Sequence, residues 1–308
     1  MKKILIIQTR VGMGDMCVFL PCIHEIAQFS NNSKIHVLTK KRTCSKAFLK
    51  DDKYIEEVIY LPEETGFKLN LCILSLLKAK KYDECYILHY GIRYYLLALI
   101  SGVKKIKFYG LLKKNESIVQ KSRMMVLKWS DKKELDFVPK IYLNKKVNKQ
   151  NQITIGIGGS GIDKKWEIKN YINLLNMILV KNSIENIIIA GGKNELEDSE
   201  KILFSFQENK KIKMYNLCEK TIDDSIHIIS KSKVYIGNDT GFMHLSASLD
   251  VISFGIFGAT PPDYSSYNKN IIPIMPPGVS NVKYGDEMMG NITPELVYKT
   301  MKNFSYFN

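Results

Sequence analysis

The stretch Val234–Ser265 constrains the fold of this chain more than any other. It reads VYIGNDTGFMHLSASLDVISFGIFGATPPDYS. The β-branched run Val234–Ile236 predicts a buried strand, which residues 237–238 are expected to break, and Asp239–Gly241 stands where a helix would start. A second apolar run, Val251–Phe254, predicts the next strand. Strand, polar turn, helix and strand make one βαβ unit, which implies a parallel sheet.

The polar turn of this unit falls at the carboxyl edge of the predicted sheet, where open α/β sheets bind their ligands. Either Asp239 or Thr240 can cap the helix, and the helix N-terminus suits an anion such as a diphosphate. His244 follows Thr240 by one helical turn, so both side chains project from the same end. The spacing alone equally fits an ordinary capped helix with a half-buried histidine.

The rest of the chain repeats this alternation and predicts two Rossmann-like α/β domains. The first domain is expected over residues 1–148 and the second over 149–308, joined by the polar segment Asn144–Gln152. The last predicted helix begins at Thr293-Pro294-Glu295, and one alternative has it return to the first domain. Residues 110–143 carry mixed charge and poor periodicity, so no element is predicted there. Helices and strands are otherwise expected at the following ranges: 2–8, 16–29, 34–39, 58–61, 67–78, 84–88, 92–100, 105–109, 153–157, 168–180, 187–190, 195–206, 213–217 and 222–230.

The charge of the chain is uneven. Residues 1–150 hold 29 Lys+Arg against 14 Asp+Glu, and residues 151–308 hold 16 against 17. The basic half either reflects a lysine-rich composition or attracts a polyanion such as a phosphorylated glycolipid or a membrane surface. Nucleic acid is not expected as a partner, because no nucleic-acid-binding motif accompanies the charge.

The length of the apolar runs predicts where the protein is located. No run reaches the roughly 18–20 residues that span a bilayer, and Tyr94–Val103 is read as a core helix. The start, MKKILIIQTR, is read as a first strand and not as a signal peptide. We therefore expect a cytoplasmic protein, with peripheral contact at the inner face of the membrane left open. The six cysteines lack metal-ligand spacing and are expected to be reduced core thiols.

The motifs resemble those of one family. The string DTGxxHLxxxL from Asp239, followed by a strand and FGxTxP, resembles the nucleotide-sugar-binding signature of the heptosyltransferases, which build the lipopolysaccharide core. GDMCVFLPCIHEI, from Gly14 to Ile26, resembles the N-terminal motif of the same family. The resemblance implies the GT-B architecture, in which two Rossmann-like domains with parallel sheets face each other across a cleft.

The resemblance also implies roles for residues of the N-terminal motif. In that family the aspartate matching Asp15 is thought to be the general base, which takes the proton of the acceptor hydroxyl. One base on one face implies a single displacement with inversion at the anomeric carbon. Gly14 allows the sharp turn before it, and Arg10 is a candidate cation that keeps the carboxylate ionised. From its position alone, Asp15 could equally be a helix cap.

The nucleotide sugar is expected to bind in the second domain. Gly158, Gly159 and Ser160 form a loop whose N–H and hydroxyl groups could meet phosphate oxygens, and Lys164 or Lys165 could neutralise the leaving diphosphate. Trp166 is expected to pack this loop onto the domain. The resemblance further assigns Asp239 to the sugar hydroxyls, Thr240 and Gly241 to the diphosphate and sugar, and His244 to the leaving group or sugar. It assigns Glu195 to the ribose, although the position equally fits a carboxylate in the first turn of a helix. No cofactor is required and no metal is implied.

These expectations define an inverting glycosyltransferase that moves a sugar, which the resemblance implies to be heptose from ADP-heptose, to a hydroxyl of an anionic glycan or glycolipid. A different nucleotide sugar and a non-catalytic nucleotide-sugar-binding protein are the alternatives. A nicotinamide-dependent oxidoreductase fits poorly. Residues 12–17 lack the third glycine of GxGxxG, and Thr39-Lys40 lacks the acidic residue that binds ribose.

Overall fold

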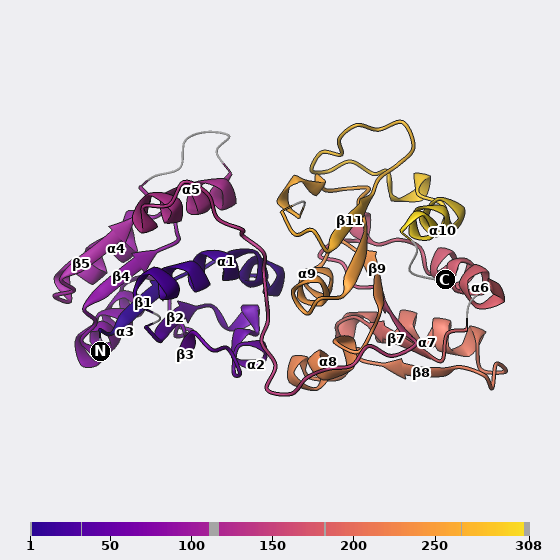
Figure 1. Cartoon of the computed structure of the whole chain (residues 1–308), viewed down its shortest axis with the longest axis horizontal. Helices are drawn as coiled ribbons and strands as arrows, with labels where there is room; N and C mark the ends of the chain where they lie inside the picture. The colour runs from indigo at the N-terminus through magenta and orange to yellow at the C-terminus, as the bar shows by residue number, and fades with distance from the viewer. Residues whose placement is uncertain (1, 32, 111–116, 182, 266, 305–308) are drawn as a thin grey trace. The chain divides into compact units, whose positions relative to one another are not determined.

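The computed structural model describes residues 2–31, 33–110, 117–181, 183–265 and 267–304. The chain divides into two compact units, Met1–Asn144 and Lys145–Asn308 (Figure 1). Each unit contains one parallel sheet with helices on both faces, so the predicted α/β class with two Rossmann-like domains is confirmed. The division falls inside the polar segment Asn144–Gln152, whose last residue already belongs to the first strand of the second unit.

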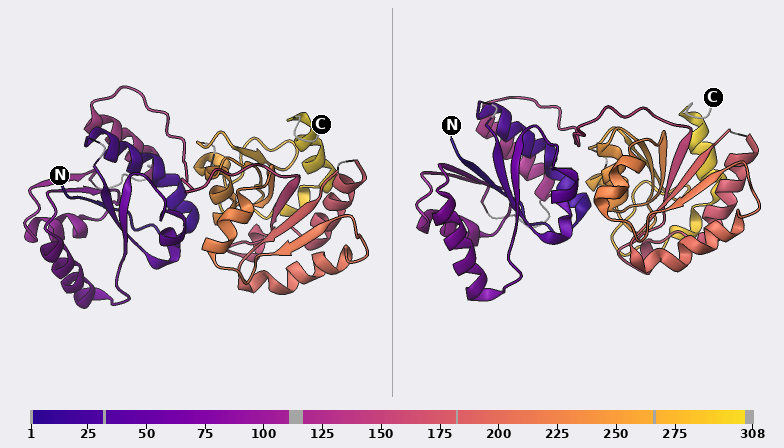
Figure 2. Two further views of the ribbon diagram at one scale, coloured as in Figure 1. Left: turned by 60° about the horizontal axis from the view of Figure 1, so that its bottom comes forward. Right: turned by 90° about the horizontal axis from the view of Figure 1, so that it is seen from below.

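The first unit holds a five-stranded sheet in the order β3-β2-β1-β4-β5. Its strands are β1 (Ile4–Ile7), β2 (Ile35–Thr39), β3 (Ile55–Tyr60), β4 (Glu84–Ile87) and β5 (Lys105–Phe108). Its helices are α1 (Met13–Phe29), the short α2 (Ser45–Phe48), α3 (Gly66–Lys80), α4 (Ile92–Ile100) and α5 (Ile118–Ser130). Helices α1 and α5 pack together on one face of the sheet, and α3 and α4 pack together on the other (Figure 2).

The second unit holds a six-stranded sheet in the order β11-β10-β9-β6-β7-β8. Its strands are β6 (Gln152–Gly156), β7 (Asn186–Ala190), β8 (Lys213–Asn216), β9 (Val234–Asn238), β10 (Ile252–Ile256) and β11 (Ile271–Ile274). Its helices are α6 (Ile168–Lys181), α7 (Leu196–Ser205), α8 (Ile222–Ile229), α9 (Gly241–Ser248) and α10 (Pro294–Asn303). Short 3₁₀ turns include η2 (Ile162–Lys164), η3 (Lys193–Glu195) and η5 (Met289–Asn291).

The central strands are buried on both faces, which is why their sequences are continuously apolar. All four residues of β1 are fully buried. In the second unit, side chains of α6, α7 and α10 join the central strands in one hydrophobic cluster. The last helix therefore belongs to the second unit, where Val297 and Met301 pack in the core, instead of returning to the first.

Some elements differ from expectation. Helix α5 occupies a segment for which no element was predicted, and residues 111–116 of that segment lie outside the described residues. Strand β11 was not predicted either. Gly237 and Asn238 do not break β9 but complete it, because both pair with β10. Helix α1 begins at Met13, three residues before the predicted start, and continues through Pro21.

None of the helices in the described parts of the chain combines the length and the apolarity needed to cross a membrane.

None of the six cysteines forms a disulfide. Four are buried as expected, but Cys44 and Cys72 are partly exposed.

Candidate functional site

The predicted site residues cluster where the strand order of each sheet reverses. In the first unit β1 pairs with both β2 and β4, and in the second β6 pairs with both β7 and β9. The loops that leave these strands in opposite directions open a crevice at the carboxyl edge, and such crevices bind the ligands of doubly wound sheets. Asp15 follows β1, the Gly158 loop follows β6, and Asp239 follows β9.

Asn238, the last residue of β9, holds the second of these crevices together. Its side chain is fully buried, and its Nδ2 donates to the carbonyl oxygens of Ile157 (3.2 Å) and Gly158 (2.9 Å). Its Oδ1 accepts from the Trp166 backbone N–H (3.0 Å) and the Tyr171 hydroxyl (2.9 Å). One amide thus fixes both ends of the glycine-rich loop.

Trp166 anchors the same loop by burial. The indole is 1% exposed and donates from Nε1 to the Ile292 carbonyl oxygen at 2.7 Å. Its ring meets Tyr171 edge to face, with centroids 4.8 Å apart. Trp166 therefore packs the loop onto the domain, as expected from the sequence.

Two glycines allow β6 and β9 to approach at this edge. Gly156 and Gly237 are paired across the strands. A Cβ on Gly237 would lie 2.2 Å from the Gly156 carbonyl oxygen, and one on Gly156 would lie 1.8 Å from the Tyr235 hydroxyl. Any larger residue would push apart the two strands that carry the site.

Asp239 is the centre of a polar cluster just beyond β9. Its Oδ2 accepts from the Thr260 hydroxyl at 2.8 Å, and its Oδ1 lies 3.6 Å from His244 Nε2. Burial opposes ionisation of this carboxyl. The His244 imidazole, the Thr260 hydroxyl and the positive charge of Lys164 outweigh burial and hold its pKa below the ordinary value. About a fifth of the side chain (21%) remains exposed, so an ionised oxygen can still meet a ligand.

His244 is nearly buried, with 5% of its side chain exposed. Its Nδ1 lies 3.2 Å from the Tyr267 hydroxyl, and the two rings are almost parallel at 7°. Tyr264 meets the imidazole edge to face. The ring is thus fixed in orientation between Asp239 and two tyrosines.

The N-terminus of α9 lies beside this cluster. Thr240 occupies the N-cap position, but its side chain makes no capping hydrogen bond. Instead its hydroxyl lies 3.5 Å from that of Tyr235. Asp239 does not cap the helix either. The alternative of an ordinary helix capped by one of these side chains is therefore not what the structure shows. The first-turn N–H groups and the positive end of the helix dipole are left for an anion.

The two adjacent lysines of the loop serve different partners. The positive charge of Lys164 helps to lower the pKa of Asp239. Lys165 Nζ lies 2.8 Å from Glu195 Oε1, in a pair whose side chains are 22% and 9% exposed. Glu195 Oε2 also accepts the Gly192 N–H at 2.7 Å, which closes the turn into α7. Gly158 borders this pair, because a Cβ there would lie 3.7 Å from Glu195 Oε2.

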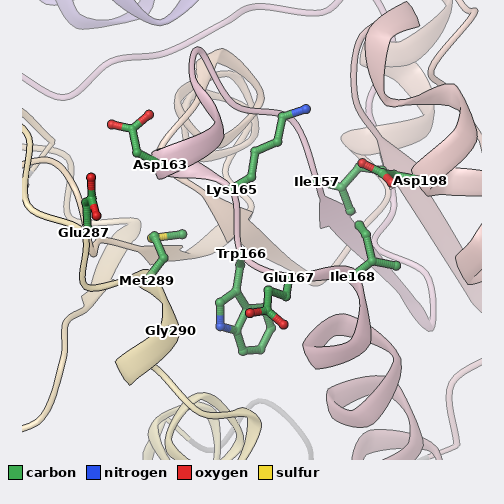
Figure 3. A pocket seen from close by; sticks show the side chains of 10 residues that line it. All are labelled: Ile157, Asp163, Lys165, Trp166, Glu167, Ile168, Asp198, Glu287, Met289 and Gly290. Carbon is green, nitrogen blue, oxygen red and sulfur yellow. The ribbon is translucent and has the colours of Figure 1, made fainter.

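A cavity of about 490 Å³ adjoins the loop (Figure 3). Glu287, Met289 and Gly290 lie on one side in this view, and Ile157, Ile168 and Asp198 on the other. Asp163, Lys165, Trp166 and Glu167 complete the lining. Four of the lining side chains are carboxylates and one is a lysine, so the cavity favours hydroxyl and amine donors over a diphosphate.

Asp15 lies in the first turn of α1 in the first unit. Its Oδ2 accepts the Gly12 N–H at 2.9 Å, and its Oδ1 accepts from Arg10 Nε at 3.0 Å. The carboxylate is 14% exposed. Asp15 is therefore not the N-cap residue but the third helical residue, which reaches back to the cap. Arg10 is the cation expected beside it.

More positive charge gathers near this carboxyl edge. Burial lowers the pKa of His89, and so does the positive charge of Lys40, Arg10 and Arg93. His89 Nδ1 accepts the Gly91 N–H at 2.9 Å, which fits a neutral ring. Lys40 and Arg93 also line a cavity of about 620 Å³. Its other lining residues are Lys41, Arg42, Leu61, Pro62, Glu63, Glu64, Leu69 and Tyr94.

The guanidinium of Arg93, at the wall of this cavity, is only partly satisfied by hydrogen bonds. Its Nε donates to Asn70 Oδ1 at 2.6 Å. Its Nη2 is buried and has no hydrogen-bond partner among the described residues. A buried guanidinium nitrogen without an acceptor is costly, so this group favours a ligand that brings an anionic oxygen.

The structure thus groups the predicted residues of the second unit into two sets around the same loop. Thr240, Gly241, His244, Lys164 and Asp239 form the first. Gly158, Lys165 and Glu195 form the second. Ser160 lies exposed at the loop surface next to Gly159. Gly14, expected to form a sharp turn before Asp15, instead lies within α1 as its second residue. Across the described parts of the chain, no group of three or more His, Cys, Asp or Glu side chains is placed to hold a metal ion.

Two residues of this site were not assigned a role from the sequence. The sequence pattern predicts Asn238 only as a strand breaker and includes Thr260 only in the FGxTxP string. The signal for Thr260 was its place directly after β10, at the same sheet edge as Asp239.

Comparison with known proteins points to one family. The model of glycosyltransferase family 9 (heptosyltransferase) matches residues 102–278, more than half of the chain. Lipopolysaccharide heptosyltransferase 2 of Salmonella typhimurium is 24% identical over 151 residues, which are 46% of this chain. The chain spans 42% of the length of that curated relative.

Solved structures share the fold along the whole chain. The ADP-heptose lipopolysaccharide heptosyltransferase II of E. coli has a TM-score of 0.76 at 17% identity and covers 98% of each chain. The E. coli heptosyltransferase WaaC with ADP has a TM-score of 0.76 at 16% identity, over 98% of this chain and 99% of that one. The chain therefore belongs to glycosyltransferase family 9, the heptosyltransferase family.

Proposed function

We propose that this protein is an inverting glycosyltransferase that moves heptose from ADP-heptose to a hydroxyl of a lipopolysaccharide-core or similar anionic glycan. The observation that carries the proposal is the cluster of Asp239, Thr260 and His244 beside the open N-terminus of α9. The helix N-terminus can bind an anion, and the ionised Asp239 carboxylate can accept hydrogen bonds from hydroxyl groups. A sugar diphosphate offers both kinds of group.

The diphosphate of the donor would bind at the N-terminus of α9. The N–H groups of Gly241 and the following residue, the Thr240 hydroxyl and the Lys164 ammonium supply donors and positive charge there. Ser160 and the backbone of Gly159 could add donors from the loop. Asp239 would repel phosphate oxygens, so it would bind sugar hydroxyls, with His244 and Thr260 holding its orientation.

The nucleoside would occupy the cavity of about 490 Å³. Its apolar residues Ile157, Ile168 and Met289 suit the faces of a base, and its carboxylates suit ribose hydroxyls and an exocyclic amine. Glu195, fixed by Lys165 at the border of this loop, is the proposed ribose acceptor. The E. coli heptosyltransferase WaaC has been solved with ADP and with ADP-2-deoxy-2-fluoro heptose, which supports ADP as the nucleotide.

Asp15 would act as the general base. It would take the proton of the acceptor hydroxyl while the oxygen attacks the anomeric carbon. The bond from that carbon to the diphosphate oxygen then breaks, its electron pair leaves with ADP, and the configuration inverts. Arg10 would keep the carboxylate ionised and oriented. The proposal requires no metal or other cofactor.

The acceptor would place an anionic group in the basic cavity of the first unit. Its lining holds four cationic side chains (Lys40, Lys41, Arg42 and Arg93) against two carboxylates, Glu63 and Glu64. The buried Nη2 of Arg93 would gain the acceptor that it lacks. Phosphate or carboxylate groups of a core glycan have the required chemistry. If the protein transfers sugar to such an acceptor, it would act in the cytoplasm. We propose no nucleic acid among its partners.

A thermal-shift panel tests the donor directly. ADP and ADP-heptose are expected to raise Tm, and UDP and GDP to raise it less, because a ligand of the native state stabilises it by mass action. Asp239→Asn should reduce the shift from ADP-heptose without reducing the shift from ADP. Preference for UDP or GDP forms would assign another nucleotide sugar. Stabilisation by NADH alone would end the proposal. Binding without transfer would identify a non-catalytic binding protein.

A further inference from the structure

The outer surfaces of α3 and α4 expose more large apolar side chains than any other part of the described chain. On α4 these are Ile92 (54% exposed), Leu96 (45%), Leu99 (54%) and Ile100 (62%). Their spacing places all four on one face of the helix, opposite the buried Tyr94, Leu97 and Ala98. On α3, Phe67 is 75% exposed and Leu71 is 49% exposed. The run read as a core helix thus has a second apolar face.

The two helices form one continuous surface. They pack against each other on the same face of the sheet, and the bond from Arg93 Nε to Asn70 Oδ1 joins them. Phe67 and Leu71 stand within one helical turn of Asn70 on α3, and Ile92 and Leu96 within one turn of Arg93 on α4, so this bond joins the parts of the two helices that carry these exposed side chains. In the described part of the second unit, by contrast, no helix carries more than one of the exposed large apolar residues, which are Val180, Phe204, Tyr215, Tyr284 and Phe304. Such scattered residues are normal on a protein surface.

The charged side chains of α3 and α4 themselves are all positive. Neither α3 nor α4 contains an aspartate or glutamate. Lys68, Lys78 and Lys81 are exposed along α3, and Lys104 and Lys105 follow α4. Between residues 66 and 105 the only acids are Asp83 and Glu84. Asp83 lies 3.9 Å from Lys104, and Glu84 lies 2.8 Å from Lys2 and 2.9 Å from Lys105.

We propose that the α3–α4 surface docks onto the surface of an anionic lipid bilayer. An apolar helical face bordered by lysines, on a helix too short to span, binds at the level of the lipid headgroups. The apolar side chains enter the boundary region while the lysines contact anionic headgroups. The basic cavity is continuous with this surface, since Leu69 of α3 and Arg93 of α4 line it. A lipid-linked acceptor could therefore place its anionic group in the cavity while the bilayer that holds its lipid contacts the α3–α4 surface. The docking itself goes beyond sugar transfer and does not depend on it.

Sedimentation with vesicles tests the proposal on the full chain. Wild type is expected to bind vesicles of phosphatidylcholine with about one third phosphatidylglycerol, and to bind pure phosphatidylcholine at least tenfold more weakly. The variant Leu96→Gln/Leu99→Gln/Ile100→Gln should lose about tenfold or more in binding, because membrane affinity scales with buried apolar area. These positions are exposed and glutamine is a good helix former, so the fold should persist, which circular dichroism checks.

Two further variants sharpen the test. Val180→Gln/Phe204→Gln/Tyr284→Gln removes a comparable exposed apolar set from the second unit and should bind vesicles as wild type does. Lys68→Gln/Lys78→Gln should weaken binding to anionic vesicles only. The Tm shift with ADP should be the same in all variants, which separates this proposal from the function proposed above.

Three results would overturn the proposal. The first is that wild type binds neither kind of vesicle. The second is that the α4 variant binds as wild type does. The third is that sedimentation velocity finds a wild-type dimer that the α4 variant converts to a monomer, because a second copy would then cover this surface.

Discussion

Asn238 Nδ2 donates a hydrogen bond of 2.9 Å to the carbonyl oxygen of Gly158, eighty residues earlier in the chain. This bond ties the loop after β6 to the end of β9, so the two sides of the candidate donor site cannot move apart without breaking it. The same amide also accepts from Trp166 and Tyr171, so this one buried side chain contributes four hydrogen bonds to the preorganisation of the loop.

Asn238→Ala should therefore destabilise the second unit. The change leaves the buried Trp166 N–H without its acceptor, while the Tyr171 hydroxyl keeps the Gly156 carbonyl oxygen at 3.0 Å, so we expect a loss of about 1–3 kcal/mol of unfolding free energy. Urea unfolding measures the loss. Asn176→Ala, at an exposed position of α6, is the matched control and should change stability by less than about 0.5 kcal/mol. Equal stability of the two variants would contradict the role given to Asn238.

The Lys165–Glu195 pair should be energetically coupled. A double-mutant cycle with Lys165→Met and Glu195→Gln is expected to give a coupling energy of about 1–2 kcal/mol, because the carboxylate is largely buried and its removal from water is compensated by the lysine. The exposed Lys169–Glu167 pair, with side chains 73% and 56% exposed, is the control and should give less than about 0.5 kcal/mol. Coupling no larger than the control would show that the buried pair does not hold the loop.

Asp239 should contribute to stability in a pH-dependent way. Its folded-state pKa lies below the ordinary value of 3.8, so the unfolded chain takes up the proton first as the pH falls. The stability difference between wild type and Asp239→Asn should be constant from about pH 5 to pH 7. It should shrink as the pH falls below 3.8 and through the folded pKa. Chemical unfolding across this range, with Asp136→Asn at an exposed position as control, measures it. A difference independent of pH would contradict the ionised state of Asp239.

The sequence predicted strands such as β4 and β7 within a residue or two because their apolar runs are continuous and bounded by polar or glycine residues. Helix α5 was missed because its buried residues, Ile118, Val119, Ser122 and Val126, form a narrow stripe among charges. The N-cap Ser117, which accepts from the Gln120 N–H, was the local signal. Strand β11 was missed because Pro273 argues against a strand, and it is tolerated here because β11 is an edge strand.

Residues of the candidate site could be predicted where they stand in a local sequence motif. They could not be predicted where their role depends on hydrogen-bond partners far away in the sequence. Asp15, Asp239 and His244 each stand in a motif that can be read along the chain. The bonds of Asn238 reach Ile157, Gly158 and Trp166, and that of Thr260 reaches back to Asp239. Nothing near Asn238 in the sequence reveals those partners, since only the pairing of β6 with β9 brings them together.

The central claim is that Asp15 is the general base of sugar transfer, and Asp15→Asn tests it most directly. Transfer of heptose from ADP-heptose to a heptose-deficient lipopolysaccharide core would be measured beside the affinity for ADP, with Asp136→Asn as the control for the loss of one carboxylate. We expect kcat to fall by a factor of about 100 or more, while the Kd for ADP stays within about threefold of wild type, because Asp15 lies outside the unit that holds the proposed nucleotide site. Transfer by Asp15→Asn at the wild-type rate would contradict the account.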